Sequence, residues 1–104
     1  PLVYAVDKGH KEIVEILIAK GADVDVMVSN GEGVDGFTSL FFAARSGHRE
    51  VAELLIANGA EVNAKDENVL TPLDYATREK QKETAGLLRK HGGKTGAELK
   101  AEGK

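Results

Sequence analysis

The stretch TSLFFAARSGHREVAELLIANGAEVNAKD, residues 38–66, decides how this chain folds. It contains two short helical patterns, at residues 39–45 and 49–57, and each is closed by a glycine, as many helix ends are. A polar segment that reads as the start of a hairpin begins at Glu61. Two such helices form one layer and cannot bury their apolar faces alone. The stretch therefore predicts similar units on both of its sides.

Two further copies of this unit are visible in the sequence. The step from Ser39 to Pro72 is 33 residues, the period expected of a turn followed by two helices, and the step from Pro1 to Ser39 is 38 residues. The corresponding segments are Gly9-His10 and Gly47-His48, GADVD at 21–25 and GAEVN at 59–63, and Ile16-Leu17, Leu54-Leu55 and Leu87-Leu88. Because many matches share the same offsets, we interpret the chain as a repeat protein.

The repeated unit resembles the ankyrin repeat. Thr71-Pro72-Leu73 fits the Thr-Pro-Leu-His start of that family, and residues 47–48 and 59–66 fit its later positions. The resemblance covers nearly everything from Pro1 to about Gly93. It implies an all-α solenoid of helix-turn-helix units with β-hairpin fingers. The expected divisions are three repeats at about 1–37, 38–70 and 71–93 and a C-terminal tail at 94–104.

Length and composition limit the possible functions. The 104 residues suffice for one domain with a modest core, and since aromatic residues are few we expect that core to be aliphatic. Acids and bases are interleaved at a net charge of −3, so nucleic acid is not an expected partner. The chain has no cysteine and no run of eighteen apolar residues. We therefore expect no disulfide, no membrane partner and a cytoplasmic location.

Helix starts are marked in all three repeats. Thr71 is followed by Pro72 at the first helical position and by Asp74 three residues after the cap, which predicts a capping box. Thr38 is expected to cap the corresponding helix of the second repeat. In the first repeat, Pro1 is expected at the first helical position, and we expect a longer array to precede it.

Two turns depart from the repeat pattern. Asn68-Val69 stands where the family prefers glycine, and because valine disfavours positive φ we expect Asn68 to adopt that conformation. Lys80-Gln81 replaces the Gly-His pair of the other repeats. We therefore expect a locally different turn between the helices of the third repeat.

The interval from Val24 to Thr38 is five residues longer than the equivalent interval from Val62 to Thr71. The extra segment, residues 27–36 (MVSNGEGVDG), is either a tolerated surface insertion, because loop length costs little entropy, or a longer recognition finger. Its G-x-G-x-x-G at 31–36 lacks the buried strand and βαβ context of a dinucleotide site, and Phe37 replaces the lysine of a phosphate-binding loop. We expect no cofactor.

The sequence offers no catalytic or metal site. His10 and His48 follow the glycines between helices, a structural position in this family, and His91 lies near a helix C-terminus, where a cationic ring suits the dipole. No His-x-x-x-His pattern or His-acid cluster brings metal ligands together. No serine, histidine and acid share a strained turn, and no paired carboxylates lie in an expected pocket, so we expect no enzyme activity.

The two ends of the array differ. In the last helix pattern, Thr84, Arg89 and Lys90 replace apolar residues of the earlier repeats, as expected of a C-terminal capping repeat with a polar outer face. The tail is expected to form a short helical turn from Thr95. The first repeat instead has an apolar outer side, through which we expect self-association or fraying. The residues of that side are Leu2, Val3, Tyr4, Val6, Ile13 and Ile16.

The resemblance places binding on one concave face, formed by the finger tips and the exposed flank of each first helix. Phe37 and Leu70 are equivalent apolar finger positions, and Arg45 and Arg78 are equivalent helix positions, a combination typical of contact hot spots. The full set carried over by position is Asp7, Lys8, Val34, Asp35, Phe37, Arg45, Ser46, Glu67, Asn68, Leu70, Arg78 and Glu79.

We therefore expect a protein-protein interaction module, a scaffold that binds a partner protein on its concave face and catalyses nothing. Two alternatives stay open. In the first, the repeats are a structural spacer or the C-terminal cap of a longer array. In the second, they regulate an enzyme whose catalytic domain lies outside this sequence.

Overall fold

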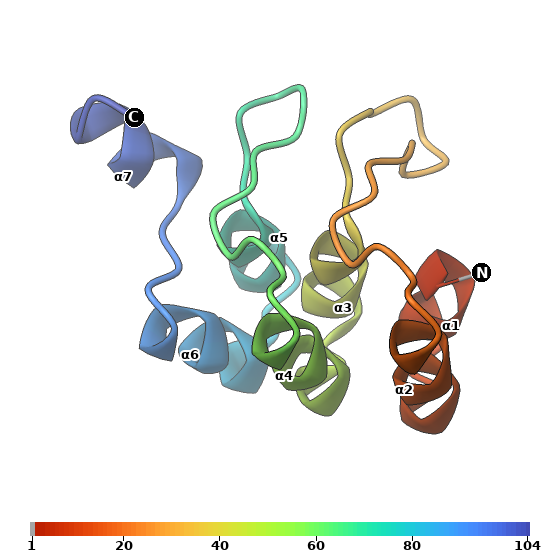
Figure 1. The fold of residues 1–104 in the computed structure, drawn as a ribbon. Helices are drawn as coiled ribbons and strands as arrows, with labels where there is room; N and C mark the ends of the chain where they lie inside the picture. Colours follow the sequence, from red (N-terminus) through yellow and green to blue (C-terminus); the bar gives the residue numbers. More distant parts are fainter. Residues whose placement is uncertain (1) are drawn as a thin grey trace.

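The computed structural model describes residues 2–104, in which seven helices alternate with turns and loops (Figure 1). The helices are α1 (Leu2–Asp7), α2 (Lys11–Ala19), α3 (Ser39–Ser46), α4 (Arg49–Ala57), α5 (Pro72–Arg78), α6 (Lys82–Lys90) and α7 (Gly96–Ala101). Pro1, expected at the first helical position, lies outside the described residues. The all-α class expected from the sequence is confirmed.

The first six helices form three pairs that stack in two layers. α3 contacts both α1 and α5 in one layer, and α4 contacts α2 and α6 in the other. Small side chains permit this close packing, because Ala43, Ala44 and Ala76 are fully buried at the contacts of the first layer. In Figure 1 the loops 22–37 and 60–71 rise from the same end of the helix stack.

Most buried core residues are aliphatic, as expected, but the core also contains a cluster of four aromatic rings. Phe37 stacks on Phe41 with ring centres 4.7 Å apart and lies edge-on to Phe42 and Tyr75 at 5.3 and 5.0 Å. Each such ring pair adds about 0.5–1.5 kcal/mol beyond the area that it buries. The chain does contain few aromatic residues, but four of them pack together where the second and third repeats meet.

The capping box expected at Thr71 is present at α5, whereas the side-chain cap expected from Thr38 is absent at α3. The Thr71 hydroxyl accepts the Asp74 N–H at 3.4 Å, and the Asp74 carboxylate accepts the Thr71 N–H at 2.9 Å. Thr38 is the N-cap residue of α3, but its hydroxyl makes no capping hydrogen bond and has no partner in the described part of the chain. The Phe41 N–H, which is equivalent to the Asp74 N–H of α5, donates to the Thr38 carbonyl at 3.0 Å instead of the hydroxyl, and the Phe41 side chain has no carboxylate for the second half of a capping box.

Val69, and not Asn68, adopts positive φ, with a value of 64°. The Asp66 carboxylate accepts the N–H groups of Asn68 and Leu70, each at 2.9 Å, and the Asp66 carbonyl accepts the Val69 N–H at 3.0 Å. These bonds close the turn around the aspartate side chain and leave the left-handed conformation to residue 69. The expectation from valine's preference is therefore wrong, because the hydrogen bonds of the turn override it.

The turn between α5 and α6 keeps the shape of the other repeats, which also contradicts the expectation. Lys80 has a φ of 59°, close to the 72° of Gly9 and the 74° of Gly47. The Gln81 N–H donates to the carbonyl of Ala76 at 2.8 Å, as the equivalent histidines do in the other two turns. This pairing holds a lysine in a conformation that costs about 1–2 kcal/mol.

The loops that precede α3 and α5 are shaped like hairpins but carry little β-pairing. In the longer loop, Val28 and Phe37 form an isolated antiparallel bridge with N–H···O distances of 2.7 and 3.0 Å. In the shorter loop, the Asp66 N–H donates to the Leu70 carbonyl at 2.9 Å. Residues 2–104 contain no β-strand, so the fingers are hydrogen-bonded loops rather than two-stranded ribbons.

The short helix expected from Thr95 is α7. The Thr95 hydroxyl and the Glu98 carboxylate form a capping box at its start. Leu99 is buried, and the Gly96 N–H donates to the Asp74 carboxylate at 2.8 Å. The tail is therefore packed against the start of α5.

The outer face of the last repeat is polar at two of the three expected positions. Arg89 and Lys90 are exposed, whereas Thr84 is 1% exposed, so its assignment to that face is wrong. Thr84 occupies the position of Val51, which is also buried, and α6 packs against α4. This position faces the preceding repeat, not the outer side.

The outer side of the first repeat is less apolar than the sequence suggests. Leu2 and Val6 are buried under α3, so they do not contribute to an exposed patch. Tyr4, Ile13 and Ile16 are 63%, 48% and 55% exposed. Three of the six expected side chains therefore form the exposed part of this side, while Val3 is partly buried.

Candidate interaction surface

The tips of loops 27–36 and 66–70 lie beside the C-terminal parts of α3 and α5. Together these four segments surround a hollow of about 370 Å³, here named the finger pocket. Its lining residues are Asn30, Glu32, Val34, Arg45, Asn68, Tyr75, Arg78 and Glu79.

Two arginines from equivalent helix positions lie in the finger pocket. The guanidinium carbon of Arg45 is 5.2 Å from the centre of the Phe42 ring, and that of Arg78 is 5.2 Å from the centre of the Tyr75 ring. Both rings belong to the buried aromatic cluster, so cation–π contact holds the two arginines on rigid supports. The repeat thus produces the same local arrangement twice.

The two arginines differ in their ionic partners. Arg45 lies 3.5 Å from a Glu32 oxygen and 3.8 Å from an Asp7 oxygen. Within residues 2–104, no Asp or Glu oxygen lies within 4.0 Å of the Arg78 guanidinium. The sequence explains the difference. Asp7, Arg45 and Arg78 occupy equivalent positions in successive repeats, so the neighbour of Arg45 in the preceding repeat is an acid, whereas the neighbour of Arg78 is another arginine.

Residues 27–36 form one wall of the finger pocket. The Asn30 side-chain oxygen accepts the N–H groups of Glu32 at 2.7 Å and Val34 at 3.1 Å. The Asn30 N–H donates in turn to the Val34 carbonyl at 2.8 Å. One asparagine therefore folds the inserted segment into a closed loop and turns Glu32 toward Arg45.

The inserted loop is attached to the loop of the third repeat. The Asp35 N–H donates to the Glu67 carboxylate at 2.8 Å, and the Glu67 N–H donates to the Asp35 carbonyl at 3.0 Å. Gly36 lies so close that an added Cβ would be 3.1 Å from the Asp66 Cα, which a glycine at φ 88° avoids. The insertion therefore contacts its neighbour and does not project freely.

Five of the twelve residues expected on the concave face line the finger pocket: Val34, Arg45, Asn68, Arg78 and Glu79. Three more, Asp35, Glu67 and Leu70, lie in the loops that form its walls, the first two exposed and Leu70 partly buried.

The expected residues of the first repeat lie outside the finger pocket. Asp7 pairs with Arg45 and accepts a hydrogen bond from the Ser46 hydroxyl at 3.4 Å. Lys8 is exposed, with its ammonium nitrogen 5.9 Å from the centre of the Tyr4 ring. Asp7, Lys8 and Ser46 therefore lie at the C-terminal ends of α1 and α3.

Phe37 is not a surface residue, and its assignment to the concave face is wrong. Its side chain is 0% exposed because the bridge to Val28 places it beneath the inserted loop, within the aromatic cluster. Its equivalent Leu70 has no such cover and stays partly buried. Equivalence by position failed here because the two loops differ in length.

Sequence reasoning missed three residues of the finger pocket: Asn30, Glu32 and Tyr75. The first two lie in the insertion, for which the sequence alone does not distinguish a tolerated surface insertion from a longer recognition finger. Tyr75 precedes Arg78 by three residues, the spacing that places two side chains on one helix face. That spacing was the available signal for the tyrosine.

The Tyr75 hydroxyl is held as a neutral donor. Burial, followed by the hydrogen bond to the Asp66 carboxylate, raises the pKa of Tyr75 to about 12, and the Arg78 cation acts in the opposite direction. Asp66 is 5% exposed and receives this hydroxyl in addition to the two N–H groups of its own turn. The ring that supports Arg78 is therefore fixed by hydrogen bonding as well as by packing.

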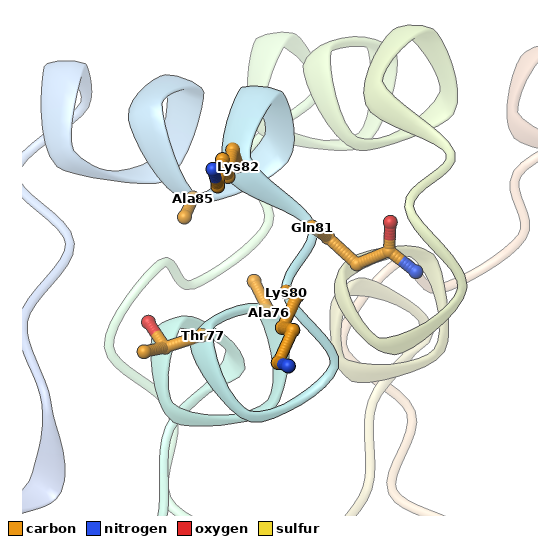
Figure 2. A pocket seen from close by; sticks show the side chains of 6 residues that line it. All are labelled: Ala76, Thr77, Lys80, Gln81, Lys82 and Ala85. Carbon is orange, nitrogen blue, oxygen red and sulfur yellow. The ribbon is translucent and has the colours of Figure 1, made fainter.

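A second hollow, of about 240 Å³, lies between α5 and α6 (Figure 2). Figure 2 shows Ala76, Thr77 and Ala85 along it, with Gln81 pointing toward the second repeat. There the Gln81 amide donates to the Arg45 carbonyl at 3.2 Å, as His48 approaches the Asp7 carbonyl at 3.0 Å. The residues that line this hollow all belong to α5, α6 and the turn between them, whereas the finger pocket is lined by segments of two repeats, so we take the finger pocket as the candidate site.

The described residues 2–104 contain no group of three or more His, Asp or Glu side chains that could hold a metal ion. Over the same range, no helix combines the length and the apolar character needed to cross a membrane.

Stacked helix pairs with hairpin-shaped loops and a loop-lined pocket define a helical repeat protein. A family model that describes three copies of the ankyrin repeat matches residues 2–101, so the chain belongs to the ankyrin repeat family. Proteins of this family generally mediate protein–protein interactions and are typically non-catalytic. Comparison with curated proteins gives no significant match.

Proposed function

We propose that this chain binds a partner protein through its concave face, centred on the finger pocket. The observation that supports this most directly is the convergence of exposed or partly buried polar and charged side chains from four separate segments on one hollow. Arginine is over-represented among the residues that dominate binding energy at interfaces, and here Arg78 lies on the rigid support of the buried Tyr75 ring.

The proposal predicts that binding depends on the loops and not on the outer helices, by which we mean the layer of α2, α4 and α6. Affinity capture from a cell extract, followed by mass spectrometry, supplies candidate partners that can be produced and titrated by isothermal calorimetry. Asn68→Arg places a bulky cation at an exposed position in the finger pocket. Glu53→Arg introduces the same side chain at an exposed position on α4 and serves as the control.

We expect Asn68→Arg to weaken binding by about tenfold or more, as loss of one interface hot spot does, while Glu53→Arg leaves the affinity unchanged. Equal affinities for all three proteins would contradict binding at this face. Partners that respond to Glu53→Arg alone would place the interface on the outer helices instead.

A further inference from the structure

We infer that the finger pocket receives the carboxylate of an Asp or Glu side chain that the partner protein presents to Arg78. This inference rests on the proposed function and adds to it the chemistry of the group that is recognised. It follows from three features of the finger pocket. The Arg78 guanidinium is rigidly held and has no acidic partner within residues 2–104, the equivalent Arg45 has acidic partners within the chain, and acidic residues also line the pocket.

Arg78 is prepared for a ligand in a way that most surface arginines are not. Its guanidinium lies over the Tyr75 ring, and that ring is only 4% exposed and tied to Asp66 through its hydroxyl. Contact with the ring face leaves the N–H groups at the guanidinium edge free to donate. A side chain held in this manner loses little conformational entropy on binding, and its planar fork matches the two oxygens of a carboxylate.

The twin site shows which group such an arginine accepts. Arg45 lies on Phe42 in the same way, and its guanidinium is approached by the carboxylates of Asp7 and Glu32. Glu32 comes from the tip of the insertion and is largely exposed, with 77% of its side chain accessible. The chain therefore satisfies one of its two equivalent arginines internally and leaves the other to an external acid.

The surrounding charges favour a singly charged carboxylate over a phosphate group. Glu32 and Glu79 also line the finger pocket and would repel a dianion more strongly than a monoanion. Asn30 uses its side-chain oxygen for the two N–H groups of its own loop, so its NH2 group is the one that remains for an incoming acceptor. An acidic side chain fits both conditions.

Selection from a phage-displayed library of random peptides tests this inference without a known partner. The peptides are displayed with their C-termini fused to the coat protein, so any carboxylate that is selected comes from a side chain. Selection on the wild-type chain should enrich peptides that share an Asp or Glu, and selection on Arg78→Gln should not. The enriched peptides are then synthesised as C-terminal amides and titrated by calorimetry.

Replacing the shared acid by its amide, or Arg78 by Gln, should each weaken binding by about tenfold, and the two changes together should weaken it no further. Arg49→Gln removes an exposed arginine from α4 and should have no effect. Glu32→Gln removes a negative charge from the finger pocket and one of the two acids near Arg45, and it should strengthen binding of the acidic peptides by about two- to fivefold. Urea unfolding of each variant verifies that it is folded.

Two outcomes separate this inference from the proposed function. Peptides that lack a shared acid but lose affinity with Asn68→Arg would overturn the carboxylate inference and leave the binding face intact. Acidic peptides that bind Arg78→Gln and Asn68→Arg as well as the wild type would overturn both. A selection on the wild type that enriches nothing beyond the selection on Arg78→Gln would also count against the carboxylate.

Discussion

The left-handed valine of the third repeat allows backbone strain to be measured against a matched control. Val69 has a φ of 64°, whereas Val26 is not among the residues with positive φ. Each valine donates its N–H to an aspartate carbonyl three residues earlier, at 3.0 Å to Asp66 and 3.4 Å to Asp23. Their exposures are 50% and 40%. The two residues thus share side chain, turn position and environment, and differ mainly in φ.

Val69→Gly should leave the chain more stable than Val26→Gly does. Both changes remove the same half-exposed side chain and add similar freedom to the unfolded chain, which lowers stability by about 0.5–1 kcal/mol. Only at position 69 does glycine also relieve the left-handed conformation, which costs about 1–2 kcal/mol. The free energies of unfolding should therefore differ by about 1–2 kcal/mol, or several degrees in Tm.

Urea denaturation followed by circular dichroism gives both free energies, and equal m-values verify that the unfolded states are comparable. A difference near zero would show that the turn around Asp66 has no strain to release. A more stable Val26→Gly would refute the reasoning outright.

Leu55→Ala should destabilise the chain by about 2–5 kcal/mol because Leu55 is fully buried, and Leu54→Ala should cost less because Leu54 is partly exposed; urea unfolding measures both, and equal losses would show the core to be misplaced. Since the folded-state pKa of Tyr75 is raised from 10.0 to about 12, the wild type should lose stability relative to Tyr75→Phe as pH rises from about 10 to about 12, and unfolding curves with the same pH dependence would refute this. The exposed Tyr4 and Ile16 should cause association that Ile16→Lys reduces, and light scattering across a dilution series that finds the wild type monomeric throughout would contradict it.

The helix pairs could be predicted from the sequence because their signals are local. The periodic apolar residues, the closing glycines and the Thr71-Pro72 start all act within a few residues of the elements that they define. The capping box at Thr95 is equally local, and α7 begins there. Family resemblance extended these signals into an array without any knowledge of contacts between repeats.

The finger pocket could be predicted only in part because its walls depend on contacts between distant segments. Arg45 and Arg78 were found by repeat equivalence, which holds as long as two repeats have the same length. Phe37 was misplaced where that condition fails, since the inserted loop covers it. The position of Glu32 follows from the hydrogen bonds of Asn30, a side-chain choice that no periodicity records.

The buried carboxylate of Asp66 determines how the finger pocket responds to local unfolding of its loops. It joins its own loop to Tyr75, while Glu67 beside it joins the same loop to the inserted segment at Asp35. The walls and the floor of the pocket therefore belong to one cooperative unit, and local opening of either loop should expose the aromatic support of Arg78 as well. Native-state hydrogen exchange should then give the amides of Asp35 and Leu70 a common free energy of opening, so that the pocket exists whole or not at all.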